Sequence, residues 1–114
     1  MKFWAEDDRP REKLRLKGRH SLSNAEILAI LIGSGTRKAS ALDIAREILQ
    51  SNEGSLDKLG HLDLKDFMQF NGIGEAKAIT LISALELGRR RKLEPAKKLA
   101  QIKSSHDAYL QLNP

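Results

Sequence analysis

Several residue types on which common protein functions depend are missing from this 114-residue sequence. Cysteine is absent, which excludes a disulfide framework, a thiol nucleophile and a thiolate zinc site. The three histidines, His20, His61 and His106, lack the paired spacing that would place two imidazoles on one metal ion. Paired carboxylates and nucleophile–base pairs are not evident either, so we expect no metal, no cofactor and no enzyme activity in this chain.

Long apolar runs are also missing. No segment reaches the roughly 20 apolar residues that span a lipid bilayer, and Met1 to Asp8 lack the apolar stretch of a signal peptide. We therefore expect a cytoplasmic protein without membrane contact. The remaining composition, 40% hydrophobic and 31% charged residues, is that of a globular protein, and the length suits one small domain with one core.

Positive charge predominates, with a formal net charge of +5, but it is unevenly distributed. Residues 1–20 carry seven cations and four anions, and residues 87–114 carry seven cations and two anions. Between them, residues 21–86 carry six cations and nine anions, so the expected core is mildly acidic. Basic flanks are compatible with an anionic partner such as nucleic acid, but they are also typical of solvated tails.

The periodicity of apolar residues and the cap signals predict an all-α protein, and strand patterns rich in β-branched residues are missing. A capping box at Ser23 and Glu26 predicts a helix that ends near Ile32. A second helix is expected to start near Ser40. The side chains that we expect these two helices to bury are Ile27, Leu28, Leu31, Leu42, Ala45, Ile48 and Leu49.

Further helices are expected towards the C-terminus. Ser55 and Asp63 are typical N-caps, and each is expected to open a short helix. The stretch from Ala76 to Leu87 is apolar on nearly every side, which predicts the central and most buried helix. After it we expect a helix extension, a charged linker broken at Pro95, and a last short helix that begins around Ser104.

An internal repeat organises these helices. The same order of helix, Gly-x-Gly and helix occurs in ILAILIGSGT…SALDIAREIL and in DFMQFNGIG…EAKAITLISAL. Neither helix pair can enclose a core alone. Two such units related by a pseudo-twofold axis are therefore expected to form a compact five-helix bundle.

The second repeat contains a longer pattern of apolar and small residues around Gly72, Ile73 and Gly74. This pattern resembles the helix-hairpin-helix motif of proteins that bind DNA without reading its sequence. The glycines would leave backbone amides free to face an anion, and Ile73 would fix the hairpin between its helices. The N-terminus of the following helix and Lys77 would add positive charge at the same place. We therefore expect a DNA phosphate site at Gly72, Ile73, Gly74 and Lys77.

A second contact with the DNA backbone is expected from four consecutive cations, Arg89, Arg90, Arg91 and Lys92. The alternative is a solvated helix C-terminus, where the helix dipole favours cations. The hairpin has an alternative too, because a tight turn can serve packing or protein contacts, and Glu75 places a carboxylate where a phosphate would approach. The loop from Gly33 to Ser40 lacks the Gly-Lys-Ser/Thr ending of a P-loop, which excludes nucleotide hydrolysis.

Four segments follow one another in the order RPREKL (residues 9–14), LSNAEILAILIGSGT (22–36), SALDIAREIL (40–49) and NGIGEAKAITLISALELGRR (71–90). Together they resemble the N-terminal domain of the RadC family of bacterial proteins, which is named for DNA repair. The resemblance covers about residues 4–112 and implies a helical domain similar to the second domain of RuvA, with paired helix-hairpin-helix units. It also implies a following domain of the JAB/MPN metallopeptidase-like type, whose His-x-His signature is not in this sequence.

These observations give one expected organisation and two expected functions. Residues 1–20 form a basic N-terminal arm, residues 21–92 a tandem helix-hairpin-helix domain, and residues 93–114 a linker and the start of the absent C-terminal domain. The first function is a non-catalytic, sequence-neutral module that binds duplex or branched DNA. The alternative is a protein-interaction or substrate-presenting module for the adjoining peptidase-like domain.

Overall fold

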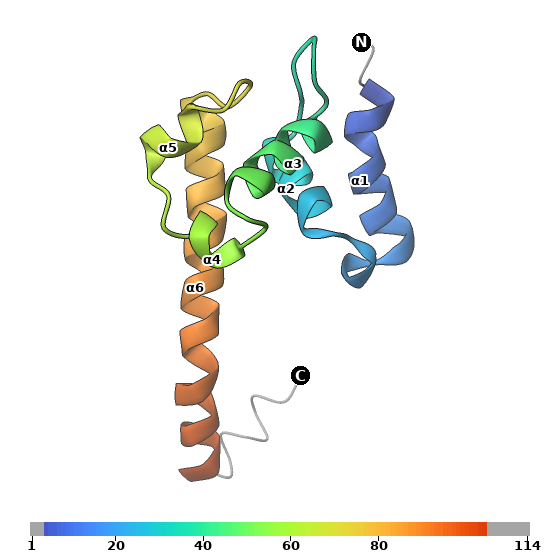
Figure 1. The fold of residues 1–114 in the computed structure, drawn as a ribbon. Coiled ribbons are helices and arrows are strands. Elements are labelled where there is room, and N and C mark those ends of the chain that lie inside the picture. The colour runs from blue at the N-terminus through green and yellow to red at the C-terminus, as the bar shows by residue number, and fades with distance from the viewer. Residues whose placement is uncertain (1–3, 105–114) are drawn as a thin grey trace.

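The computed structural model describes the backbone of residues 4–104 and the side chains of residues 5–94. All regular elements of the described chain are helices, as predicted (Figure 1). The last short helix that the sequence predicts falls outside the described residues. The elements are, in chain order, α1 (Trp4–Lys17), the 3-10 helix η1 (Arg19–Ser21), α2 (Asn24–Ile32), α3 (Ala41–Ser51), α4 (Leu56–Leu59), α5 (Leu64–Met68) and α6 (Glu75–Ser104).

The predicted helix starts are confirmed by their cap hydrogen bonds. The Ser23 hydroxyl accepts from the Glu26 amide at 3.2 Å, and the Glu26 carboxylate accepts from the Ser23 amide at 2.8 Å. The same reciprocal pair opens α3, between Ser40 and Asp43, at 3.1 and 3.0 Å. Capping of this kind uses only neighbouring residues, which is why the sequence alone predicts it. The caps of α4 and α5 are Ser55 and Asp63.

One hydrophobic core joins both helix pairs. The helices α2 and α3 pack against each other, and α6 closes the core by packing against α2 and α5. Because neither pair encloses this core alone, the two units depend on each other for stability. The buried hydrophobic residues are Leu28, Ala29, Ile32, Ala41, Ile44, Ala45, Ile48, Leu59, Phe67, Ile73, Ala78 and Leu81.

The predicted burial in α2 and α3 is correct in part. Leu28, Ala45 and Ile48 are buried as predicted. Ile27 lies on the outside instead, with 43% of its surface exposed, while Ile32 is buried. The run ILAILI is apolar on several faces, so its periodicity does not decide which face points inward. Half-buried against the core are Leu31, Leu42 and Leu49.

The prediction that residues 76–87 form the most buried helix is wrong. Ala78 and Leu81 are buried, but Ile79 is 50% exposed and Leu87 is 69% exposed. The helix α6 packs against α2 and α5 with one side only and lies at the edge of the molecule (Figure 1). The apolar residues on its other side are therefore not explained by the core.

Both ends of the described chain are more regular than predicted. Residues of the expected basic arm form α1, which packs against α2 and α3 and joins α2 through an ion pair of 3.1 Å between Lys13 and Glu26. At the other end, α6 passes through Pro95 without a break. A proline removes one backbone hydrogen bond, but strong helix formers surround it here. The predicted domain boundaries after residues 20 and 92 stay predictions.

Candidate nucleic-acid interface

Two glycine-containing loops lie close together at one end of the molecule (Figure 1). The first hairpin, residues 33–40, joins α2 to α3, and the second hairpin, residues 69–74, joins α5 to α6. The Lys77 ammonium group donates a hydrogen bond of 2.7 Å to the Ser34 carbonyl oxygen, which ties α6 to the first hairpin. The two repeats therefore bring their loops to one shared surface.

Gly72 is required where the two hairpins meet. Its φ of 91° lies in the region that favours glycine. A Cβ atom at Gly72 would also lie 2.7 Å from Cδ1 of Ile44 and 3.0 Å from Cγ2 of Thr36. The close approach expected for this glycine is therefore real, and the atoms that approach it belong to the first repeat.

Ile73 contributes to packing. Its side chain is 4% exposed and belongs to the core, as expected of the residue that fixes the hairpin. Its amide donates to the Phe70 carbonyl oxygen at 3.1 Å. The Ile73 amide is thus committed to the turn, and the predicted phosphate site at this hairpin depends on other donors.

Those donors are found at the start of α6. The amides of Glu75, Ala76 and Lys77 donate no hydrogen bond to any group in the described part of the chain. Gly74 precedes them, and a Cβ atom there would meet nothing within 4 Å. The fold itself does not require a glycine at position 74, and the missing side chain leaves open space beside the three amides. Glu75 is also exposed at this point, so one carboxylate borders the space.

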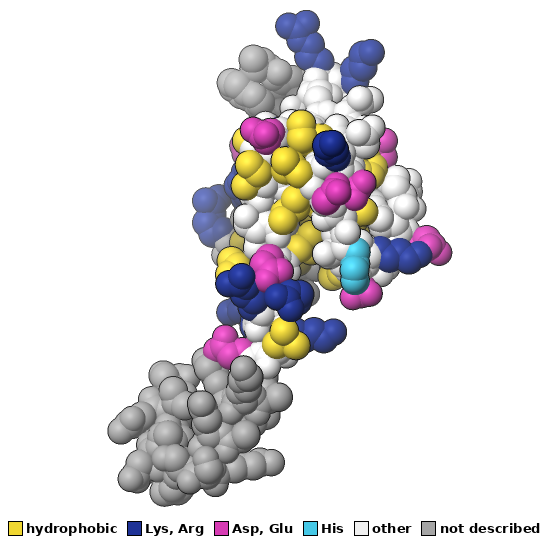
Figure 2. All heavy atoms as spheres, turned by 90° about the vertical axis from the view of Figure 1, so that its left-hand side faces the viewer, with side chains coloured by type: hydrophobic (Ala, Val, Ile, Leu, Met, Phe, Trp, Pro, Cys, Tyr) yellow, Lys and Arg dark blue, Asp and Glu magenta, His cyan; other side chains and the backbone are white. Residues whose placement is uncertain are grey.

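The four predicted auxiliary cations lie away from the hairpins. Arg89 lies fifteen positions beyond Gly74, which corresponds to about 22 Å along the helix axis. The Arg89, Arg90, Arg91 and Lys92 side chains are exposed. Figure 2 shows Lys and Arg side chains gathered around α6 below the globular part of the molecule. The structure thus divides the predicted site residues into two groups rather than one.

Two of these cations are already paired. Arg89 donates to Glu86 at 3.0 and 2.9 Å, and Arg90 donates to the same carboxylate at 2.8 Å. Hydrogen bonds from Arg89 and then from Arg90 lower the pKa of Glu86 to about 2. Part of the positive charge that the sequence shows at this point is therefore neutralised within the helix.

The first hairpin contributes cations that the sequence-based site did not include. Arg37 and Lys38 are exposed at its tip. Together with Asn71 of the second hairpin they line an open hollow of about 570 Å³, which Glu47 also borders. The sequence GSGTRK contains these two cations, but its pattern was tested only against the P-loop, which it does not match.

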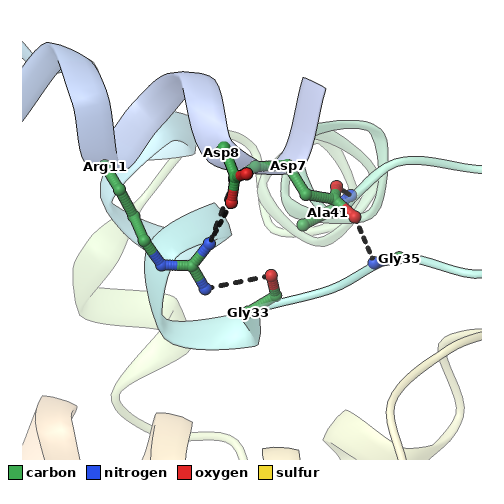
Figure 3. Close-up of polar contacts among 6 residues, drawn as sticks. All are labelled: Asp7, Asp8, Arg11, Gly33, Gly35 and Ala41. Atoms are coloured by element: carbon green, nitrogen blue, oxygen red, sulfur yellow. Dashed lines mark hydrogen bonds and ion pairs between the residues drawn. The ribbon is translucent and has the colours of Figure 1, made fainter. Parts of the chain in front are cut away.

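The first hairpin is also attached to α1 (Figure 3). Asp7 is 8% exposed, and its two carboxylate oxygens accept hydrogen bonds from the Gly35 amide at 3.1 Å and the Ala41 amide at 2.8 Å. Arg11 donates to the Gly33 carbonyl oxygen at 3.0 Å. The sequence gives no indication of these contacts, because Asp7 and Ala41 are 34 positions apart in the chain.

A different surface exposes hydrophobic side chains. Figure 2 shows them gathered at the centre of the face formed by α4, α5 and α6. Met68 is 41% exposed and Ile79 is 50% exposed. Exposed apolar residues that cluster on one face are typical of contact surfaces for other proteins.

No group of three or more histidine and acidic residues within the described chain is placed to hold a metal ion. None of the described helices combines the length and the apolar character needed to cross a lipid bilayer.

Comparison with known proteins identifies relatives. Residues 1–79 match the family described as UPF0758 N-terminal. The chain is 49% identical over its full length to a UPF0758 protein of Flavobacterium johnsoniae, of which it covers 49%. It is 41% identical over 96% of its length to a UPF0758 protein of Porphyromonas gingivalis, of which it covers 48%. The chain thus spans about half the length of these curated relatives. No solved structure matches it.

Proposed function

This chain belongs to the UPF0758 family, and we propose that it is a non-catalytic DNA-binding module of a RadC-like protein. It would bind duplex or branched DNA through the phosphate backbone, without reading the base sequence. In this proposal the two repeats act as helix-hairpin-helix units, and the second hairpin is the main phosphate site.

One observation carries the proposal. The three amides of Glu75, Ala76 and Lys77 have no hydrogen-bond partner in the described residues, and they lie behind a glycine that the fold does not require. Unpaired amides at the positive end of a helix dipole favour an anion such as a phosphate oxygen. A side chain at position 74 would occupy the space through which a phosphate would approach.

The surrounding charges also favour an anion. Lys77 is held between the hairpins by Ser34, and Arg37 and Lys38 lie on the neighbouring loop. The carboxylates of Glu47 and Glu75 oppose them, so the expected affinity is modest. Contacts to phosphate position a protein on DNA but carry no base information. Five aromatic residues in the whole chain are too few for a base-stacking platform, which favours duplex over single-stranded DNA.

A second candidate function rests on a different observation. Met68 of α5 and Ile79 of α6 are exposed, and Figure 2 shows hydrophobic side chains gathered on the face formed by α4, α5 and α6. A protein partner that covers them would gain the free energy of burying apolar surface. In this alternative the domain presents substrates to, or docks against, an adjoining peptidase-like domain in the longer relatives.

The test is fluorescence anisotropy of labelled duplex and branched DNA with the wild-type chain and Lys77→Glu, at low and physiological salt. We expect the variant to lose at least tenfold in affinity, and the slope of log K against log salt to fall by about one, because one phosphate contact is removed. The control is Lys58→Glu on α4, which carries the same charge change on a lysine paired with Glu53. If both variants weaken binding equally, or if the wild type does not bind at either salt concentration, the proposal is wrong.

A further inference from the structure

We propose that the first hairpin is also an oxyanion-binding site, and that the chain fills this site with its own carboxylate, Asp7. The contacts of α1 and the geometry of the first hairpin support this site. Its consequence for DNA rests on the proposed function.

Both repeats place a glycine beside the start of a helix, but the number of residues between the glycine and the helix differs. In the second repeat, Gly74 directly precedes the first residue of α6. In the first repeat, five residues separate Gly35 from Ala41, the first residue of α3. These residues fold back through a hydrogen bond of 2.8 Å from the Thr36 amide to the Ala39 carbonyl oxygen. The glycine and the helix start therefore lie together in both repeats.

Gly35 shows how tight this folding is. A Cβ atom at Gly35 would lie 2.1 Å from the Ala39 carbonyl oxygen and 2.7 Å from Cα of Ser40. Contacts this short with backbone atoms cannot be relieved by moving a side chain. Only glycine therefore places its amide next to the start of α3, where it points to the same anion as the Ala41 amide.

Asp7 occupies the position that an external anion would take. One carboxylate oxygen accepts from Gly35 and the other from Ala41, so the group bridges the hairpin and the helix as a phosphate would. No lysine or arginine pairs with this carboxylate in the described residues. Burying a carboxylate is unfavourable unless hydrogen bonds compensate for the lost hydration, and here two amides and the N-terminus of an 11-residue helix do so. The arrangement selects for a negative oxygen group.

The consequence is that α1 closes the anion site of the first hairpin and leaves the start of α6 uncovered. The helix is held in place by Arg11, which binds the Gly33 carbonyl oxygen, and by Lys13, which pairs with Glu26. While α1 is in place, a phosphate can bind at the second hairpin only. Displacement of α1 would open the first site on the same end of the molecule and allow contacts with two phosphates.

The first experiment is thermal unfolding of Asp7→Ala in increasing sodium phosphate, compared with sodium chloride at equal ionic strength. The variant should unfold at a lower temperature than the wild type, and phosphate should restore its stability by filling the emptied site. At a phosphate concentration ten times the dissociation constant, we expect Tm to rise by roughly 5–10 °C relative to chloride.

The matched control is Asp8→Ala, because Asp8 lies on the same helix with a 62% exposed side chain. Phosphate also stabilises proteins by exclusion from their surfaces, and both the control and the wild type measure that general effect. If Asp7→Ala gains no more from phosphate than Asp8→Ala does, the first hairpin is not an anion site.

A second variant keeps the inference testable if Asp7→Ala does not fold. Asp7→Ser keeps one oxygen that can accept a hydrogen bond, but it removes the charge and shortens the side chain, which leaves room for phosphate. Adding inorganic phosphate to this variant should shift the NMR signals of the Gly35 and Ala41 amides, and should leave them unchanged in the wild type. Unchanged signals in the variant would overturn the inference. Neither readout uses DNA, so the site can stand even if the wild type fails to bind DNA, and the reverse also holds.

Discussion

At the scale of single residues, the two glycines of the second hairpin occupy their positions for different physical reasons. Gly72 has a positive φ and packs against Ile44 and Thr36, so the fold needs it. A Cβ atom at Gly74 would meet nothing within 4 Å, so packing does not require a glycine there. The sequence motif predicts the same role for both glycines, because residue spacing alone does not show which atoms a Cβ atom would contact.

The close contacts of Gly72 predict that a side chain at this position lowers the free energy of unfolding. Gly72→Ala should lower the free energy of unfolding by about 2–4 kcal/mol, because the new methyl group overlaps Ile44 in the core and φ is unfavourable for alanine. The matched control is Gly54→Ala, which has a φ of 71° but no atom within 4 Å of the new Cβ. It should lose only about 1–2 kcal/mol. Urea unfolding of both variants measures the difference, and equal losses would contradict the contact with Ile44.

The hydrogen bonds of the Asp7 carboxylate cannot be predicted from the sequence. Its contacts cross 28 residues to Gly35 and 34 residues to Ala41. Periodicity and capping rules describe interactions within one or two turns of a helix, so they cannot predict this one. The second hairpin was predictable because its glycines, Ile73 and the following helix are adjacent in the sequence.

At the scale of helices, features set by the local sequence are predictable, and features set by tertiary contacts are not. The starts of α2, α3, α4 and α5 follow from capping residues and were predicted correctly. The burial of α6 was predicted wrongly, because burial depends on which elements pack against a helix, and an apolar composition does not reveal them. The basic segment of α6 shows the same limit, since its pairing with Glu86 becomes visible only in the structure.

That pairing predicts how Glu86 titrates. Hydrogen bonds from Arg89 and Arg90 hold its pKa at about 2 in the folded helix, below the ordinary value of 4.5. A lowered pKa in the folded state means that the interaction stabilises the helix above about pH 4.5 and is lost as the pH falls towards 2. The side-chain carboxyl signal of Glu86 in an NMR titration should therefore have its midpoint near 2.

The control for this titration removes the donors. Changing Arg89 and Arg90 together to glutamine should return the midpoint of Glu86 towards its ordinary value. A midpoint of Glu86 that does not move in the double variant would show that these arginines do not hold its pKa down.

At the scale of the whole molecule, the repeat predicted that two units share one core, and the structure agrees. It adds that the two hairpins meet at one end and that the hydrophobic face of α4, α5 and α6 lies elsewhere (Figures 1 and 2). The four cations of the sequence-based site lie on neither the hairpins nor the core. Two surfaces of different chemistry are therefore available, one for each candidate function.

These two surfaces predict that DNA binding can be weakened without changing the hydrophobic face. Gly74→Ser should weaken DNA binding at least fivefold, because the new side chain fills the space beside the α6 amides and its hydroxyl competes for them. Stability should be maintained, because serine is a favoured residue before a helix. Ile79→Gln changes the exposed hydrophobic face without changing charge, and its DNA affinity should stay within twofold of the wild type.

Anisotropy with labelled duplex DNA measures both variants, and thermal unfolding confirms that both are folded. These two variants test the location of the phosphate closely, because Ile79 of α6 lies only five positions, or about 7 Å, beyond Gly74. A phosphate held at the start of α6 should distinguish the two positions, since it contacts amides rather than the exposed side of the helix. If Ile79→Gln weakens DNA binding as much as Gly74→Ser does, DNA lies across the hydrophobic face and the hairpin is not its phosphate site.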